Sequence, residues 1–153
     1  TVKANGKGQY LVRVAKQGTM EYSINAKTRQ GTIAKVGGGK IRAKFIPPPQ
    51  AEVANTTSGV VKTGVAKVQP GVVATLKGFD FDAPFQVTSF RFVLWPKIGD
   101  PVEIDNNGAR FTSSVKEAIS RSRPGDRWLF ENVKAKGPDG RIQPVNSVTI
   151  TLN

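Results

Sequence analysis

Hydrophobic and polar positions alternate along most of this chain. Residues 20–27 read Met-Glu-Tyr-Ser-Ile-Asn-Ala-Lys, and residues 148–152 alternate Val, Ile and Leu with Thr. Because successive side chains of a strand point to opposite faces, this period is typical of strands with one buried face. The 16 Gly and 10 Pro leave little room for long helices. We predict a mainly β protein with two small β modules in tandem, the first a partial sandwich and the second β-sandwich-like with one short helix.

The first module is expected to open with a hairpin. A strand through Val14, a turn at Gln17-Gly18 and a second strand over residues 20–27 give this hairpin one buried face. A break at Gly37–Gly39 precedes another strand over residues 41–45. These three or four strands are too few for a sandwich, which needs about seven. We therefore expect a module truncated at its N-terminus, within a fragment of a longer protein.

Three consecutive prolines, Pro47 to Pro49, end the first module. Each of them lacks a backbone N–H donor and has a fixed φ, so the segment cannot continue a central strand and forms an extended connector. We place the domain boundary here and predict modules over residues 1–49 and 50–153.

The second module begins with two long strands separated by Pro84, the second of them over residues 85–95. Trp128 opens a further strand, which a turn over residues 136–141 connects to a terminal strand over residues 148–152. These last strands are predicted to form a closing hairpin.

One helix is predicted, near residues 113–122, after a turn at Asp105–Gly108. Ser114 and Glu117 have the spacing of a capping box, and Pro124-Gly125 ends the helix. A narrow apolar stripe predicts that the helix lies on a sheet.

Residue composition excludes much catalytic chemistry. The sequence has no Cys and no His, which removes thiolate nucleophiles, the usual zinc ligands and the usual general base. The segment Phe79-Asp80-Phe81-Asp82 contains the one suggestive acidic pair. In an extended chain, Phe79 and Phe81 share a buried face while Asp80 and Asp82 point outward, without the ligand pattern of a calcium loop. We predict no catalytic residue, no cofactor and no metal.

The net charge of +12 is concentrated in the first third of the chain. Residues 1–50 contain ten Lys or Arg and the single acid Glu21, whereas residues 51–153 contain thirteen basic and ten acidic side chains. The aromatic side chains of the first third do not interleave with basic ones as a base-stacking platform would. A solvated basic face is therefore favoured over nucleic-acid binding.

Possible partner-docking residues lie near the helix end. Arg121, Arg123 and Arg127 can complement the exposed carbonyls of the helix, or they can meet an acidic partner. Trp95 can anchor a partner, although aromatic residues on such a strand more often fill the core, as we expect for Trp128.

Two motifs resemble the C-terminal region of the GldM/PorM family. They are "FDFDAPFQVTSF" at residues 79–90 and "KAKGPDG" at residues 134–140. Upstream, "GQYLVRVAKQGTMEYSI" and "GKIRAKFIPPPQAEV" are similar to the end of the immunoglobulin-like domain that precedes the last domain of that family. The resemblance implies that the first module is the C-terminal part of an immunoglobulin-like sandwich.

The resemblance also implies a function. The family forms a dimeric periplasmic stalk of the type IX secretion and gliding machinery of Bacteroidetes, anchored in the inner membrane through an N-terminal region that binds a GldL/PorL-type motor protein. The stalk would pass motor motion to a ring of GldK/PorK-type and GldN/PorN-type proteins. This chain would be a non-catalytic distal part of it. The alternative from the residues alone is a basic adhesion or carbohydrate-binding β module, and a third is a nucleic-acid-binding fragment.

Overall fold

The computed structural model describes residues 2–14, 16–44, 46–78 and 83–153. The chain divides into two compact units, Thr1–Ile46 and Pro47–Asn153, which are described separately below. Strands dominate both units, which confirms the predicted mainly β class.

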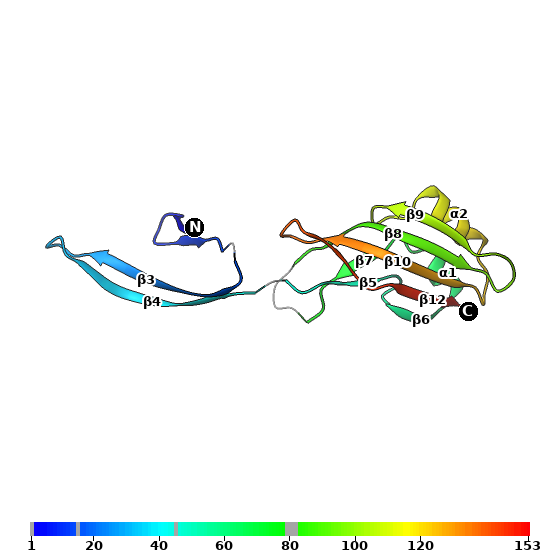
Figure 1. The fold of residues 1–153 in the computed structure, drawn as a ribbon, viewed down its shortest axis with the longest axis horizontal. Helices are drawn as coiled ribbons and strands as arrows, with labels where there is room; N and C mark the ends of the chain where they lie inside the picture. Colours follow the sequence, from blue (N-terminus) through cyan, green and yellow to red (C-terminus); the bar gives the residue numbers. More distant parts are fainter. Residues whose placement is uncertain (1, 15, 45, 79–82) are drawn as a thin grey trace. The chain divides into compact units, whose positions relative to one another are not determined.

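The first unit consists of two antiparallel hairpins (Figure 1). Their strands are β1 (Val2–Ala4), β2 (Tyr10–Val12), β3 (Gly18–Lys27) and β4 (Ile33–Ala43). The predicted hairpin between the strand ending at Val14 and the strand from Met20 is wrong, because β2 pairs with β1 and β3 pairs with β4. Gly6 and Gly8 adopt positive φ and turn the chain back after β1, where the Asn5 N–H bonds to the Gln9 carbonyl at 2.8 Å.

The three glycines at 37–39 lie inside β4 and do not interrupt it as predicted. They allow a close approach of β3: a Cβ on Gly38 would stand 2.6 Å from the Tyr22 carbonyl oxygen, and one on Gly39 would stand 2.9 Å from the Tyr22 hydroxyl. Glycine within a strand here serves close packing of its neighbour.

The second unit is built on a six-stranded sheet with strand order β6-β12-β10-β8-β9, and β11 also pairs with β10. Only β6 and β12 are parallel among the described pairs of this sheet. The strands are β6 (Ser58–Val61), β8 (Gln86–Trp95), β9 (Val102–Asn107), β10 (Arg127–Lys136), β11 (Ile142–Pro144) and β12 (Val148–Leu152). The predicted closing hairpin is confirmed, since β10 pairs with both β11 and β12.

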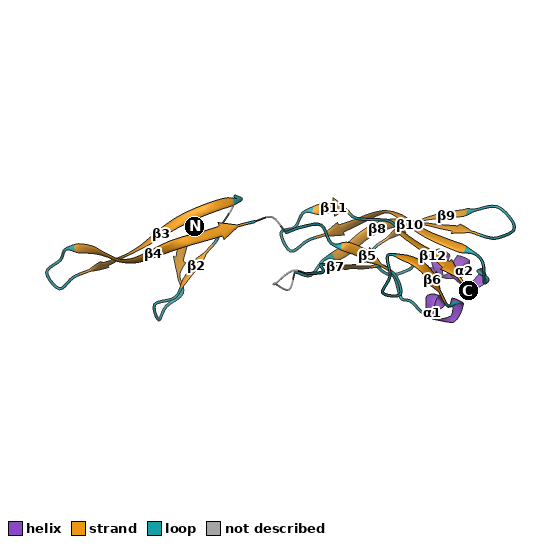
Figure 2. Cartoon of the chain, turned by 90° about the horizontal axis from the view of Figure 1, so that it is seen from below, coloured by secondary structure: helices purple, strands orange, loops and turns teal. Residues whose placement is uncertain are grey.

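One face of this sheet carries the core. The short strands β5 (Gln50–Glu52) and β7 (Val73–Thr75) and the helices α1 (Thr63–Lys67) and α2 (Ser113–Arg121) contribute to a single buried cluster with the sheet (Figure 2). Its largest fully buried side chains are Trp128, Phe92, Phe130, Ile150 and Leu152. The predicted core position of Trp128 is confirmed.

The predicted helix near residues 113–122 is confirmed as α2, but its capping box is wrong. Thr112 is the N-cap residue, so Ser114 lies inside the first turn, and Glu117 pairs with Arg121 instead. The predicted turn at Asp105–Gly108 is also wrong, because β9 extends to Asn107.

One helix was not predicted, and one strand is shorter than predicted. The helix α1 was not predicted, because five residues are too few to show a helical period, although Ala66 is fully buried. The strand expected before Pro84 is reduced to β7. The predictions on residues 79–82 lie outside the described residues.

β6 is an edge strand of the sheet. At Ser58, its backbone N–H and C=O that point away from the sheet are hydrogen-bonded within the same segment. Thr149 donates its N–H to the Thr57 carbonyl, so the groups of Ser58 itself turn away from β12. The Thr56 hydroxyl accepts the Ser58 N–H at 3.3 Å and donates to the Ser58 carbonyl at 2.7 Å. One side chain therefore covers this part of the edge.

Candidate docking surface

Trp95 lies on the face of the sheet opposite the core. Along β8, the core side takes Phe90, Phe92 and Leu94, so Trp95 alternates to the other side and is 53% exposed. The expectation that Trp95 fills the core is therefore wrong. The strand is apolar on both faces, since Val93 is also buried, and its pattern could not assign the face of Trp95.

Register places Arg127 directly beside Trp95. The two residues are antiparallel Cα partners of β10 and β8, and Arg127 in turn faces Thr151 of β12. Cross-strand partners have their side chains on the same face of a sheet, with Cβ atoms about 5 Å apart. The indole and the guanidinium therefore form one surface.

Asp126 fixes the backbone around this surface. Its side chain is almost fully buried, with Oδ1 accepting the Lys97 N–H at 2.9 Å and Oδ2 accepting the Arg123 N–H at 2.7 Å. This one carboxylate joins the loop after β8, the segment after α2 and the start of β10. Sequence reasoning missed Asp126, although an Asp after Pro124-Gly125 is a common turn residue.

The basic groups nearby lack acidic partners. Lys97, Arg123 and Arg127 are exposed and form no ion pair in the part of the chain that the structure describes. Arg121, in contrast, pairs with Glu117 on its own helix. The structure thus pairs two of the four predicted docking residues, Trp95 and Arg127, across neighbouring strands, and Asp126 joins the backbone of a third, Arg123, to the start of β10.

The one basic side chain of β8 already has acidic partners. Arg91 donates to Asp105 on β9 at 2.9 Å and lies 3.7 Å from Glu103. The hydrogen bond from Arg91 to Asp105 raises the pKa of the guanidinium above its ordinary value, and the charges of Asp105 and Glu103 add to this. Arg91 therefore stays charged, and two carboxylates of β9 already balance its charge.

One more exposed apolar side chain lies in the adjoining loop. Ile98, in the loop after Trp95, is 90% exposed. We call Trp95, Lys97, Ile98, Arg123 and Arg127 the Trp95 surface. Protein interfaces are enriched in Trp and Arg, and their strongest contacts come from apolar anchors within a polar rim. The Trp95 surface has the chemistry to bind a protein that offers an apolar pocket and carboxylates.

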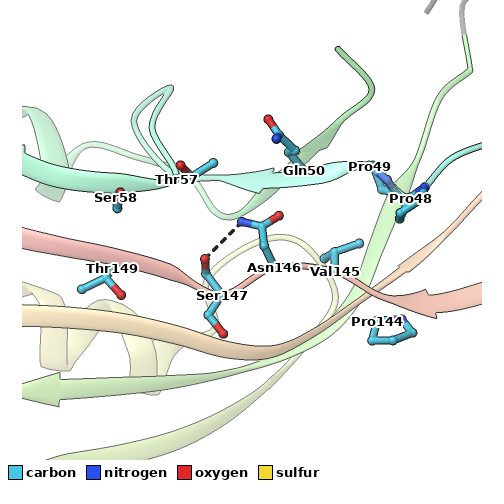
Figure 3. A pocket seen from close by; sticks show the side chains of 10 residues that line it. All are labelled: Pro48, Pro49, Gln50, Thr57, Ser58, Pro144, Val145, Asn146, Ser147 and Thr149. Atoms are coloured by element: carbon cyan, nitrogen blue, oxygen red, sulfur yellow. Dashed lines mark hydrogen bonds between the residues drawn. The ribbon is translucent and has the colours of Figure 1, made fainter. Parts of the chain in front are cut away.

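A groove of about 560 Å³ lies elsewhere on the second unit (Figure 3). The Asn146 side chain crosses it, accepting the Ala51 N–H at 2.8 Å and donating to the Ala51 carbonyl at 3.1 Å. The lining residues are neutral and none is aromatic: Pro48, Pro49, Gln50, Thr57, Ser58, Pro144, Val145, Asn146, Ser147 and Thr149. The groove therefore offers hydroxyl and amide groups but no platform for stacking a sugar ring.

The described residues show neither a metal-binding cluster nor a membrane-spanning helix. They contain no group of three or more His, Cys, Asp or Glu placed to hold a metal ion. No helix in the same part of the chain has the length and apolar character needed to cross a membrane.

Comparison with protein families assigns the second unit. Residues 47–153, the whole of the second unit, match a family model described as the GldM C-terminal domain. This confirms the family indicated by the two sequence motifs. A search of curated proteins found no match.

Proposed function

The chain belongs to the GldM family through its C-terminal domain, and on that premise we propose that it is a non-catalytic periplasmic part of a stalk in the type IX secretion and gliding machinery. The family implies a component of that machinery. The stalk would transmit inner-membrane motor motion to the ring associated with the outer membrane. The match over residues 47–153 carries this proposal.

We propose that the Trp95 surface is where this chain docks on GldK/PorK-type or GldN/PorN-type ring proteins. Trp95 would enter an apolar pocket while Arg123 and Arg127 meet carboxylates at its rim. The Asp126 contacts hold the backbone of all three segments in place, so little conformational freedom is lost on docking. Preorganisation of this kind suits a contact that must carry load.

The residues support a role without catalysis. Cys and His are absent from the sequence. Among the described residues of the second unit, the two buried acids already have partners: Asp126 accepts two backbone N–H groups, and Glu52 pairs with Lys77. Force transmission requires stiff modules and a docking surface. The second unit is consistent with both requirements.

We further propose that the protein is a homodimer, anchored in the inner membrane through a region outside this chain that binds a GldL/PorL-type motor protein. Every described residue of 2–44 is exposed or only partly buried. Apolar side chains such as Tyr10, Tyr22 and Ile24 line a groove of about 570 Å³ between its two hairpins. A second copy, exchanging strands, would cover these side chains.

A binding assay with purified ring proteins tests the docking proposal. Trp95→Ala is expected to weaken the affinity by about 30-fold and Arg127→Gln by several-fold, because truncation of a central anchor costs more than loss of one rim charge. Ile142→Ala removes an equally exposed apolar side chain from β11 and serves as the control. Unchanged affinity for the Trp95 variant, with the protein folded, would refute docking through this surface.

The alternative of a carbohydrate-binding β module has weaker support. The neutral groove around Asn146 has no aromatic lining residue, whereas sugar sites commonly stack rings on aromatic side chains. Retention of the chain on immobilised glycans, lost on substitution of Ser147 and Thr149, would favour it.

A further inference from the structure

The β3–β4 ribbon of the first unit separates charge from apolar surface. On one face the register sets Glu21 opposite Lys40 and Thr19 opposite Arg42. On the other face, Met20 lies opposite Ile41. Because partners across an antiparallel pair share a face, the charged side chains lie on one face of the ribbon, which also carries Ile33 opposite Lys27.

A β-bulge at Val36 brings a further lysine onto the charged face. Ile24 pairs with Gly37 but Asn25 pairs with Lys35, so Val36 is an extra residue in β4. In an unbroken strand, Lys35 would lie on the face opposite Lys40, since they differ by an odd number of residues. The bulge shifts the alternation by one position and aligns Lys35 with Lys40.

The result is a line of positive charge, which we call the basic ribbon face: Lys27, Lys35, Lys40 and Arg42. The four side chains are exposed. Glu21, the single acid among residues 1–46, lies 2.9 Å from Lys40. The first unit therefore contains no acidic side chain that could neutralise the other three.

The face lacks the features of a specific protein or nucleic-acid site. Three of its four cations are lysines, which are strongly hydrated and depleted at protein interfaces. Tyr22, the one aromatic residue in positions 18–43, belongs to the opposite face, so nothing here can stack on a base. Between Arg42, opposite Thr19, and Lys27, the charges span about 26 Å along β3.

We propose that the basic ribbon face binds an anionic lipid surface through the phosphate groups of the headgroups. An array of headgroup phosphates can pair with lysines spaced along a strand, and no single phosphate needs a fixed position. Each Lys or Arg near such a surface strengthens binding by about fivefold, and the effect is screened by salt. This activity is separate from docking through the Trp95 surface.

Sedimentation of the chain with lipid vesicles tests the proposal. We expect binding to vesicles of phosphatidylcholine with phosphatidylglycerol, weakening as salt rises, and no binding to phosphatidylcholine alone. The triple variant Lys27→Gln, Lys35→Gln and Arg42→Gln should weaken binding by about 100-fold. The matched control Lys116→Gln, Lys134→Gln and Lys136→Gln removes the same net charge from exposed positions of the second unit and should leave binding unchanged.

A variant with the opposite effect keeps the test decisive if the triple variant does not fold. Glu21→Gln removes the one acid of this face and releases Lys40, so it should strengthen vesicle binding several-fold. Equal losses in the two triple variants, or no gain in Glu21→Gln, would overturn the proposal. Binding to polyglutamate but not to anionic vesicles would also overturn it, in favour of an acidic protein.

Discussion

Asn106 joins β9 to α2 through a fully used side-chain amide. Its Nδ2 donates to the carbonyls of Gly108 and Arg110, each at 3.0 Å, and its Oδ1 accepts the Thr112 N–H at 2.8 Å. The side chain is 1% exposed, so water cannot replace these bonds. Asn106 thereby orders the entry to a helix whose N-cap residue makes no side-chain cap bond.

Replacing Asn106 by Ala should lower the free energy of unfolding of the second unit by about 2 to 4 kcal/mol, because buried carbonyls and an N–H lose their partner. Asn107→Ala, at the exposed neighbouring position, should have little effect. Urea unfolding followed by tryptophan fluorescence measures both. Equal stability of the two variants would show that the Asn106 amide is dispensable.

Trp128 is fully buried, and its indole N–H has no hydrogen-bond partner among the described residues. Trp128→Phe removes this unsatisfied donor along with some packing, so we expect a cost below about 2 kcal/mol. Phe130→Ala, in ring contact with Trp128, should cost about 3 to 5 kcal/mol because it leaves a cavity. Thermal unfolding of the two variants should therefore rank them in this order.

Elements whose evidence is local could be predicted from the sequence. The alternation in β12 and the apolar stripe in α2 each indicate which side of the element is buried, without information about neighbouring elements. The pairing of β2 could not be predicted, because a turn around Gly6 and Gly8 competes with the one at Gly18, and both sequences permit a hairpin. Trp95 was assigned to the wrong face because β8 is apolar on both.

At the same scale, the glycines of β4 can be tested separately. Gly38→Ala places a Cβ against the Tyr22 carbonyl, which is backbone and cannot move without separating the strands. At Gly37 the nearest atom is the Ile24 Cδ1 at 3.6 Å, an ordinary contact. We expect Gly38→Ala, but not Gly37→Ala, to reduce the hydrogen-exchange protection of amides in β3 and β4. Equal protection in the two variants would contradict this close approach.

The whole molecule consists of units with very different burial. The second unit has a continuous core, whereas no described residue of 2–44 is buried. A two-stranded ribbon is marginally stable in water by itself. The stability of the first unit should therefore depend on what covers its apolar face, while the second should fold by itself.

Light scattering over a range of protein concentrations tests this difference. The chain should gain mass towards a dimer as its concentration rises, because association covers the apolar groove of the first unit. Residues 47–153 alone should stay monomeric and keep the melting temperature of their unit. If the chain stays monomeric at all concentrations while the amides of the β3–β4 ribbon are protected from exchange, a second copy does not cover the apolar groove.

The hydrogen bonds of the Thr56 hydroxyl affect how the chain associates with itself when many copies are close together. An open strand edge is a template on which another chain can pair, and this leads to fibre growth when copies of a chain are crowded. With both outward groups of Ser58 already hydrogen-bonded, an incoming strand finds no free donor at that position and an acceptor that already holds one bond. Thr56→Val would leave the Ser58 N–H and C=O without these bonds and open to an incoming strand. Seeded polymerisation of the variant should therefore be faster than that of the parent chain.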